Sequence, residues 1–192
     1  MIAVPEIFYS PQKTLAEIKA SPRPAQSLLA AMSAWLSFIT GILLIIHRTV
    51  TLKQFFAVYL FTFIFFLLLV FFKTLLVHFF AEVLGGDGKI TLFIFLLAYS
   101  MMPLHFFLPV GLLMRQAPMF YILAVSLICV GWAGVLGLEA LKVHYGLSWG
   151  KSLAAGLAPF LFLILVPVLI ALTAFFAGLT LLISQLSTRF AL

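Results

Sequence analysis

Apolar residues fall in five long runs along the chain, separated by short polar breaks. The runs are Leu28–Ile46, Phe55–Leu84, Ile90–Met114, Pro118–Leu138 and Leu153–Ile183. An α-helix rises about 1.5 Å per residue, so about 20 residues cross a hydrocarbon core of about 30 Å. Membrane β-strands alternate apolar and polar residues, whereas residues 61–72 are almost continuously apolar. The pattern predicts an all-α polytopic membrane helix bundle with five transmembrane helices.

Three of these runs are expected to be irregular, the second, the third and the last, which also contains two prolines. Phe55–Leu84 would extend about 45 Å as a straight helix, and its second half contains Lys73. We expect that half to leave the hydrocarbon core, with the Lys73 ammonium reaching the headgroups, because a charge near the bilayer centre is costly. In the third run Pro103 and Pro109 each remove a backbone donor, which predicts a kinked or split helix.

The first 27 residues differ from the rest and are expected to form an N-terminal cytoplasmic or interfacial arm, with residues 28–192 as the transmembrane domain. Ser10 followed by Pro11 predicts a helix start. Leu15 and Ile18 then share one face, which favours a short helix on the membrane surface. Because so short a helix is marginal alone, a mobile tail is the alternative.

Composition excludes most soluble classes of protein. The chain has 192 residues, of which 65% are hydrophobic and 8% charged, whereas a soluble domain is about 25% charged. So few charges cannot cover a water-facing surface. The single cysteine, Cys129, excludes a disulfide scaffold. The chain is therefore an integral membrane protein.

The distribution of basic residues predicts the orientation. With five spans and the N-terminus inside, seven basic residues face the cytoplasm and four face the other side. The two sets are Lys13, Lys19, Arg23, Lys73, Lys89, Lys142 and Lys151, and Arg48, Lys53, Arg115 and Arg189. Cytoplasmic segments carry an excess of Lys and Arg. The sequence therefore favours a multi-pass protein of the plasma membrane with a cytoplasmic N-terminus.

Three segments carry a family likeness. They are Phe8-x-x-Pro11-x-x-Thr14, the turn Gly85-Gly86-Asp87-Gly88 followed by Ala98-Tyr99-Ser100 and Pro103, and the loop His144-Tyr145-Gly146 with Gly150-Lys151-Ser152. In this order they resemble the opening, the glycine-rich turn and the late loop of prokaryotic Yip1-domain proteins. The Asp-Leu-Tyr-Gly-Pro motif of eukaryotic members is absent. The resemblance implies a bacterial or archaeal branch and a five-span fold, but it supplies no agreed activity.

Two loops superficially suggest catalytic or nucleotide chemistry. Residues 146–152 end in Gly-Lys-Ser, but three residues separate the first glycine from that triplet where a phosphate loop requires four. We expect a turn there, with Ser148 or Ser152 capping the last helix. Asp87 is the only aspartate in the chain, which excludes a pair of aspartates that share a proton.

Metal chemistry has little support in the sequence. His78 and Glu82 are four residues apart and share a helix face, but no His-Glu-x-x-His pattern is present. We expect no metal, no cofactor and no enzymatic activity.

Small residues indicate where helices approach closely. Gly131, Gly134 and Gly137 recur every three positions, and Ala174 and Gly178 are four apart. Such faces allow apolar helices to associate in lipid, either within the bundle or between copies. The phenylalanine-rich face of the second run is expected to contact lipid; its members are Phe61, Phe65, Phe66, Phe71 and Phe72.

These patterns lead to two hypotheses of function. The first is a non-enzymatic membrane organiser or adaptor for other membrane proteins, with a trafficking role implied only by the family resemblance. Its polar contacts would come from Glu82, Asp87, Lys89, Glu139, Lys142 and His144. The alternative is a small transporter or channel for an ion or small solute, with a path at His105, Pro103 and Pro109. The expected partners are the lipid bilayer, other membrane proteins and a second copy of the chain, with no nucleic acid.

Overall fold

The computed structural model describes residues 6–45, 51–113, 117–162, 164, 165, 167 and 173, and no strand is found among them. The chain divides into two compact units, residues 1–156 and residues 157–192. In the second unit residues 157–162 are helical. The fifth predicted span, Leu153–Ile183, lies largely outside the described residues, as do Ala174 and Gly178, so a fifth crossing stays a prediction.

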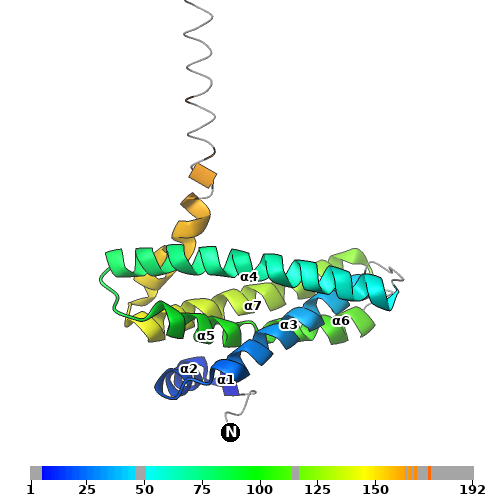
Figure 1. Cartoon of the computed structure of the whole chain (residues 1–192), viewed down its shortest axis with the longest axis horizontal. Helices are drawn as coiled ribbons and strands as arrows, with labels where there is room; N and C mark the ends of the chain where they lie inside the picture. Colours follow the sequence, from blue (N-terminus) through cyan, green and yellow to red (C-terminus); the bar gives the residue numbers. More distant parts are fainter. Residues whose placement is uncertain are drawn as a thin grey trace, which may run out of the picture. The chain divides into compact units, whose positions relative to one another are not determined.

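The first unit is built from helices whose order is shown in Figure 1. They are α1 (Glu6–Tyr9), α2 (Pro11–Ala20), α3 (Pro24–Ile45), α4 (Leu52–Val83), α5 (Ile90–Ser100), the 3-10 helix η1 (Met102–Phe106), α6 (Phe107–Leu113) and α7 (Met119–Tyr145). A further helical segment begins at residue 149. Within the described residues four helical stretches are long and apolar enough to cross a membrane: α3, α4, α7 and the combined stretch Ile90–Leu113. The chain is a multi-pass membrane protein.

Local sequence signals set the ends of the long helices. α4 begins at a reciprocal cap, in which the Thr51 side chain accepts from the Gln54 N–H and the Gln54 side chain accepts from the Thr51 N–H. It ends next to Gly85, whose φ is +85°. α7 ends at Gly146, whose φ of +67° lies in the left-handed region that glycine adopts without strain. Glycine therefore terminates both helices.

The third span is interrupted at Pro103, as predicted, but not at Pro109. α5 stops at Ser100, and the chain continues as η1 with Pro103 buried near its start before α6 begins. Pro103 cannot donate a backbone hydrogen bond, which ends the regular helix there. Pro109 does not break α6, because it lies in the first turn, where backbone donors have no partner within the helix.

The close helix crossing occurs at glycines other than those expected. A Cβ atom on Gly111 would lie 2.7 Å from the Gly41 carbonyl oxygen, so α3 and α6 approach backbone to backbone. Gly131 and Gly134 have open space around them in the described part of the chain, and Gly137 is in ordinary contact with Leu97 and Ser100. Among the described residues, therefore, the first two of these glycines contact no other helix.

α4 exposes most of its surface and runs along the other long helices of its unit (Figure 1). The phenylalanines expected to contact lipid are exposed at positions 61, 65, 71 and 72. Phe66 is the exception, because its ring stacks on Trp35 of α3 with centroids 4.1 Å apart. An exposed apolar surface of this extent is stable in contact with the hydrocarbon of a membrane, and not in contact with water.

The N-terminal arm packs into the first unit. α2 forms as predicted, with Pro11 in its first turn, and its apolar residues Leu15 and Ile18 are buried. They belong to one core cluster with Leu136 and Leu141 of α7. The apolar face of α2 therefore contacts protein, and the position of this helix at a membrane surface stays a prediction.

Candidate functional site: a polar cluster at one end of the bundle

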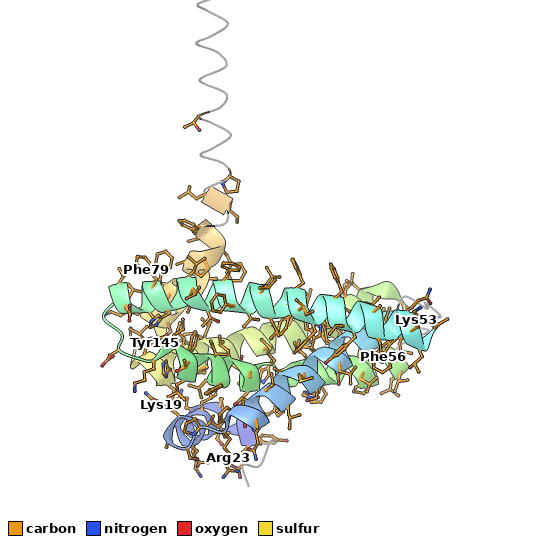
Figure 2. All side chains as sticks on the ribbon, viewed as in Figure 1. Lys19, Arg23, Lys53, Phe56, Phe79 and Tyr145 are labelled. Carbon is orange, nitrogen blue, oxygen red and sulfur yellow. The ribbon has the colours of Figure 1, made fainter. Side chains whose placement is uncertain are left out.

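Polar side chains from four separate segments meet at one end of the first unit. The segments are α2, the end of α4 with the turn after it, the end of α7, and residues 146–152, which include the start of the last helix. We call this group the polar end cluster; it comprises Gln12, Lys19, His78, Glu82, Asp87, Lys89, Glu139, Lys142, His144, Tyr145 and Lys151. Figure 2 shows Lys19 and Tyr145 at this end, with Lys53 at the opposite end of α4.

A chain of polar contacts joins α4 to α7 within the cluster. The His78 Nδ1 atom lies 2.7 Å from the Tyr145 hydroxyl, and His78 Nε2 lies 3.3 Å from a Glu82 carboxylate oxygen. Tyr145 is buried, with its ring edge-on to Phe93 at 5.3 Å. The Glu82 side chain is 56% exposed. These contacts thus connect the hydroxyl of the buried residue Tyr145 to the exposed carboxylate of Glu82.

The glycine-rich turn lies directly on the end of α7. The Asp87 N–H donates to the Tyr145 carbonyl at 3.4 Å, and the Lys151 ammonium donates to the Leu84 carbonyl at 2.8 Å. A Cβ atom on Gly86 would come within 2.8 Å of Tyr145 Cβ. A Cβ atom on Gly88 would come within 2.6 Å of His144 Nε2. Only glycine permits this approach of the turn to α7.

His144 connects the same turn to the interior. Its Nε2 lies 2.9 Å from the Lys89 carbonyl and must donate, because a carbonyl oxygen only accepts. Its ring is parallel to that of Phe93, with centroids 5.9 Å apart. The Nδ1 atom is buried and has no hydrogen-bond partner in the described part of the chain. His144 therefore fixes the start of α5 against the end of α7.

The N-terminal arm completes the cluster from the other side of α7. The Lys19 ammonium donates to the Val143 and His144 carbonyls at 3.0 and 2.8 Å. These carbonyls belong to the last turn of α7, where carbonyl oxygens have no N–H donor within the helix and the negative end of the helix dipole lies. Gln12 donates to Glu139 at 3.4 Å. A lysine and an amide thus hold α2 on the end of α7.

The structure brings the six residues expected to face a partner to the same end of the bundle, but it does not expose all of them. Glu82, Asp87 and Lys89 are exposed, and Lys142 is half-buried. Glu139 and His144 retain only 9% and 2% of their surface. α2 covers Glu139, which pairs with Lys142 at 3.6 Å, and the turn covers His144. The role of all six residues as partner contacts stays a prediction.

The proposed transport residues lie elsewhere, in the third span. His105 Nε2 lies 3.0 Å from the Ser33 hydroxyl of α3, and His105 Nδ1 lies 3.1 Å from the Met102 carbonyl. Pro103 is buried and Pro109 is exposed. Both nitrogens of His105 therefore have protein partners, which is the arrangement of a histidine that joins η1 to α3.

The last helix begins where the loop motif predicts. The Ser152 N–H donates to the Ser148 carbonyl at 2.9 Å, which places Ser148 at the boundary of the helix. The Ser152 hydroxyl is buried and has no hydrogen-bond partner among the described residues, so it does not cap the helix.

In the part of the chain that the structure describes, no three His, Cys, Asp or Glu side chains are grouped to hold a metal ion.

Sequence reasoning did not identify Tyr145, Lys19, Gln12 and Lys151 as members of the site. Their partners are remote: Tyr145 and His78 are 67 residues apart, and Lys19 and His144 are 125 apart. The local pairs of the cluster, His78 with Glu82 and Glu139 with Lys142, are four and three residues apart, a spacing that sequence alone can identify.

Comparison with known proteins gives one match. A family model described as the Yip1 domain matches residues 6–172, which spans every helix of the first unit. No curated protein and no solved structure matches the chain.

Proposed function

This chain belongs to the Yip1 domain family, and we propose from that premise that it is a non-enzymatic membrane organiser or adaptor for other membrane proteins. The polar end cluster is the contact surface, and the surface lies on the cytoplasmic side of a plasma membrane. The proposal rests on one observation above all. The exposed residues Glu82 and Asp87 lie on a segment that is held to α7 by contacts of two buried residues, Tyr145 and His144.

Rigidity is what makes this end suitable as a contact surface. A loop that must be ordered on binding loses conformational entropy, and this reduces affinity. Here Lys151 and the Asp87 N–H already fix the turn. Lys89, two residues after Asp87, and Lys142, which pairs with Glu139, add positive charge at this end of the bundle. The surface therefore offers both signs of charge in a defined arrangement, which supports selection among partners by electrostatic complementarity.

The experiment is charge reversal followed by affinity purification of cross-linked membranes. The variant Glu82→Lys/Asp87→Lys changes two exposed residues, so it should fold as wild type, and it should lose the proteins that the wild type retains. Lys53→Glu at the opposite end of α4 is the matched control and should retain them (Figure 2). An unchanged set of proteins with the double variant would refute the adaptor.

A transporter or channel is the second candidate, supported by the broken third span at Pro103. Interrupted membrane helices commonly border substrate paths. His105→Ala should abolish flux in proteoliposomes if His105 lines a path. The satisfied hydrogen bonds of His105 favour the adaptor instead. Equal flux in vesicles with the wild-type protein and in protein-free vesicles would exclude the transporter.

A further inference from the structure

The side of α4 that faces the bundle is interrupted midway along the helix. Phe63 and Thr74 on this face retain only 8% and 0% of their surface. Leu67 and Val70 occupy the same face between them, at the spacing of four and three residues that aligns side chains along a helix. Leu67 nevertheless retains 41% of its surface. α4 therefore contacts the bundle on both sides of this position and leaves a gap there.

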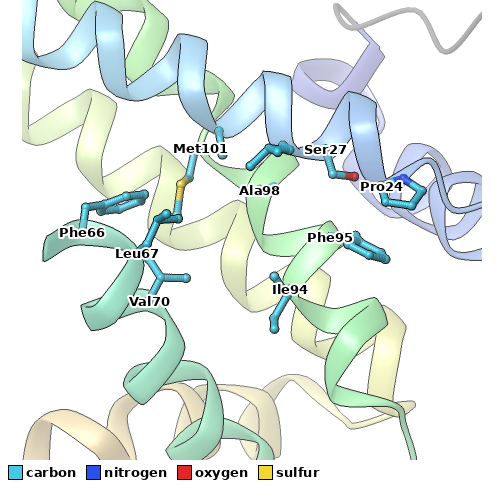
Figure 3. Close-up of a pocket in the computed structure, with 11 residues that line it drawn as sticks. Pro24, Ser27, Phe66, Leu67, Val70, Ile94, Phe95, Ala98 and Met101 are labelled. Atoms are coloured by element: carbon cyan, nitrogen blue, oxygen red, sulfur yellow. The ribbon is translucent and has the colours of Figure 1, made fainter. Parts of the chain in front are cut away.

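The gap is a groove with a volume of about 110 Å³ between α3, α4 and α5 (Figure 3). Small side chains opposite α4, Ala31 and Ala98, leave the space open. Of the residues that line it, Ser27 carries the one side-chain hydroxyl, and this hydroxyl donates to the Arg23 carbonyl at 3.1 Å. The groove is therefore lined by apolar side chains, and its single polar side chain already has a hydrogen-bond partner. An apolar ligand is the kind of ligand that this lining can bind.

The volume decides between a lipid chain and a protein segment. An α-helix with its side chains is about 10 Å across, so even one turn of it occupies far more than the 110 Å³ of this groove. An apolar cavity of on the order of 150 Å³ stays dry and takes a small hydrocarbon. Several methylene groups of one acyl chain therefore match the space, and the apolar outer side of α4 gives bilayer lipid direct access to it.

A positive charge adjoins one end of the groove. Pro24 and Ser27, at the start of α3, line it there. Arg23 precedes Pro24 directly and is exposed. A guanidinium binds phosphate oxygens in pairs, so this end favours a lipid with a net negative headgroup. We propose that the groove binds one acyl chain of an anionic phospholipid, with its headgroup at Arg23.

Trp35 provides a direct readout of occupancy. Its ring stacks on Phe66, which lines the groove. With Trp132→Phe and Trp149→Phe, Trp35 is the single tryptophan of the full-length protein. The protein is reconstituted in phosphatidylcholine vesicles that contain equal fractions of either brominated phosphatidylglycerol or brominated phosphatidylcholine. Bromine on an acyl chain in the groove quenches Trp35. We expect about fivefold tighter apparent binding of the anionic lipid, the effect of one basic side chain at a membrane surface.

Two variants separate the headgroup from the groove. Arg23→Gln should remove the preference for phosphatidylglycerol. The control Lys53→Gln, at the start of α4 and away from the groove lining, should keep that preference. Ala98→Phe fills the groove and should reduce quenching by both lipids. Leu28→Phe narrows the groove from an exposed lining position and should also reduce the quenching of Trp35. Leu29 is exposed but does not line the groove, so Leu29→Phe should show wild-type quenching. These two surface variants test the groove even if Ala98→Phe misfolds.

The outcomes that overturn the proposal are distinct. Equal quenching by both brominated lipids in the wild type, or a preference that survives Arg23→Gln, excludes the anionic headgroup site. Wild-type quenching in both Ala98→Phe and Leu28→Phe excludes the groove. Weak quenching by both lipids means that another protein segment or a second copy covers the groove.

Discussion

The Tyr145 hydroxyl lies 2.7 Å from His78 Nδ1, and this contact joins the end of α7 to the end of α4. The two residues also meet ring to ring, with centroids 5.7 Å apart. α4 is otherwise the least buried of the candidate spans. This part-buried contact therefore helps to hold the end of α4, with Glu82, against α7.

Tyr145→Phe tests this contact. The variant keeps the ring against Phe93 but leaves His78 Nδ1 without its partner. We expect a loss of about 0.5–1.5 kcal/mol in stability, seen as a melting temperature a few degrees lower for the detergent-solubilised protein. Tyr121→Phe changes an exposed tyrosine of the same helix and should melt as wild type. Equal melting of both variants would show that the hydroxyl contributes nothing.

Lys19→Met should release the N-terminal arm. It removes two donors to unpaired carbonyls at the end of α7, and each charged hydrogen bond contributes about 1.5–3 kcal/mol when buried, less at this half-buried site. Hydrogen exchange should rise across α2 and not in α3. Lys13→Met, on the exposed side of α2, is the control. Protection of α2 that persists in the Lys19 variant would show that Leu15 and Ile18 suffice to dock it.

Gly111→Ala should destabilise the protein through the α3–α6 crossing. The new methyl group would press on the Gly41 backbone, which has no flexible side chain to give way, and overpacking of this kind costs about 1–3 kcal/mol. Thermal unfolding in detergent measures the loss. Gly134→Ala meets nothing within 4 Å and should be neutral or stabilise α7 by up to about 1 kcal/mol. A comparable loss at Gly134 would instead show that this face is covered.

Cysteine labelling tests the topology in a Cys129→Ser background. Gln12→Cys, Asp87→Cys and Ser148→Cys change exposed residues, and all three should react with a membrane-impermeant thiol reagent from the same side. Four crossings between the arm and the late loop require this result. Arg189→Cys should react only from the opposite side if a fifth span follows. Reaction of that variant from the first side would contradict the predicted odd number of spans.

The sequence by itself determined the class of protein and the approximate bounds of the four apolar helical stretches that the structure describes. Long apolar runs in an almost uncharged chain leave no alternative to lipid, and Pro103, Gly85 and Gly146 act locally on the backbone of their own segment. Only the tertiary structure decided which polar groups meet. Glu139 and His144 are buried because α2 and the glycine-rich turn, remote in sequence, pack over them. Likewise Gly41 and Gly111, rather than Gly131 and Gly134, form the close crossing, because a glycine permits contact but does not specify which helix lies opposite it.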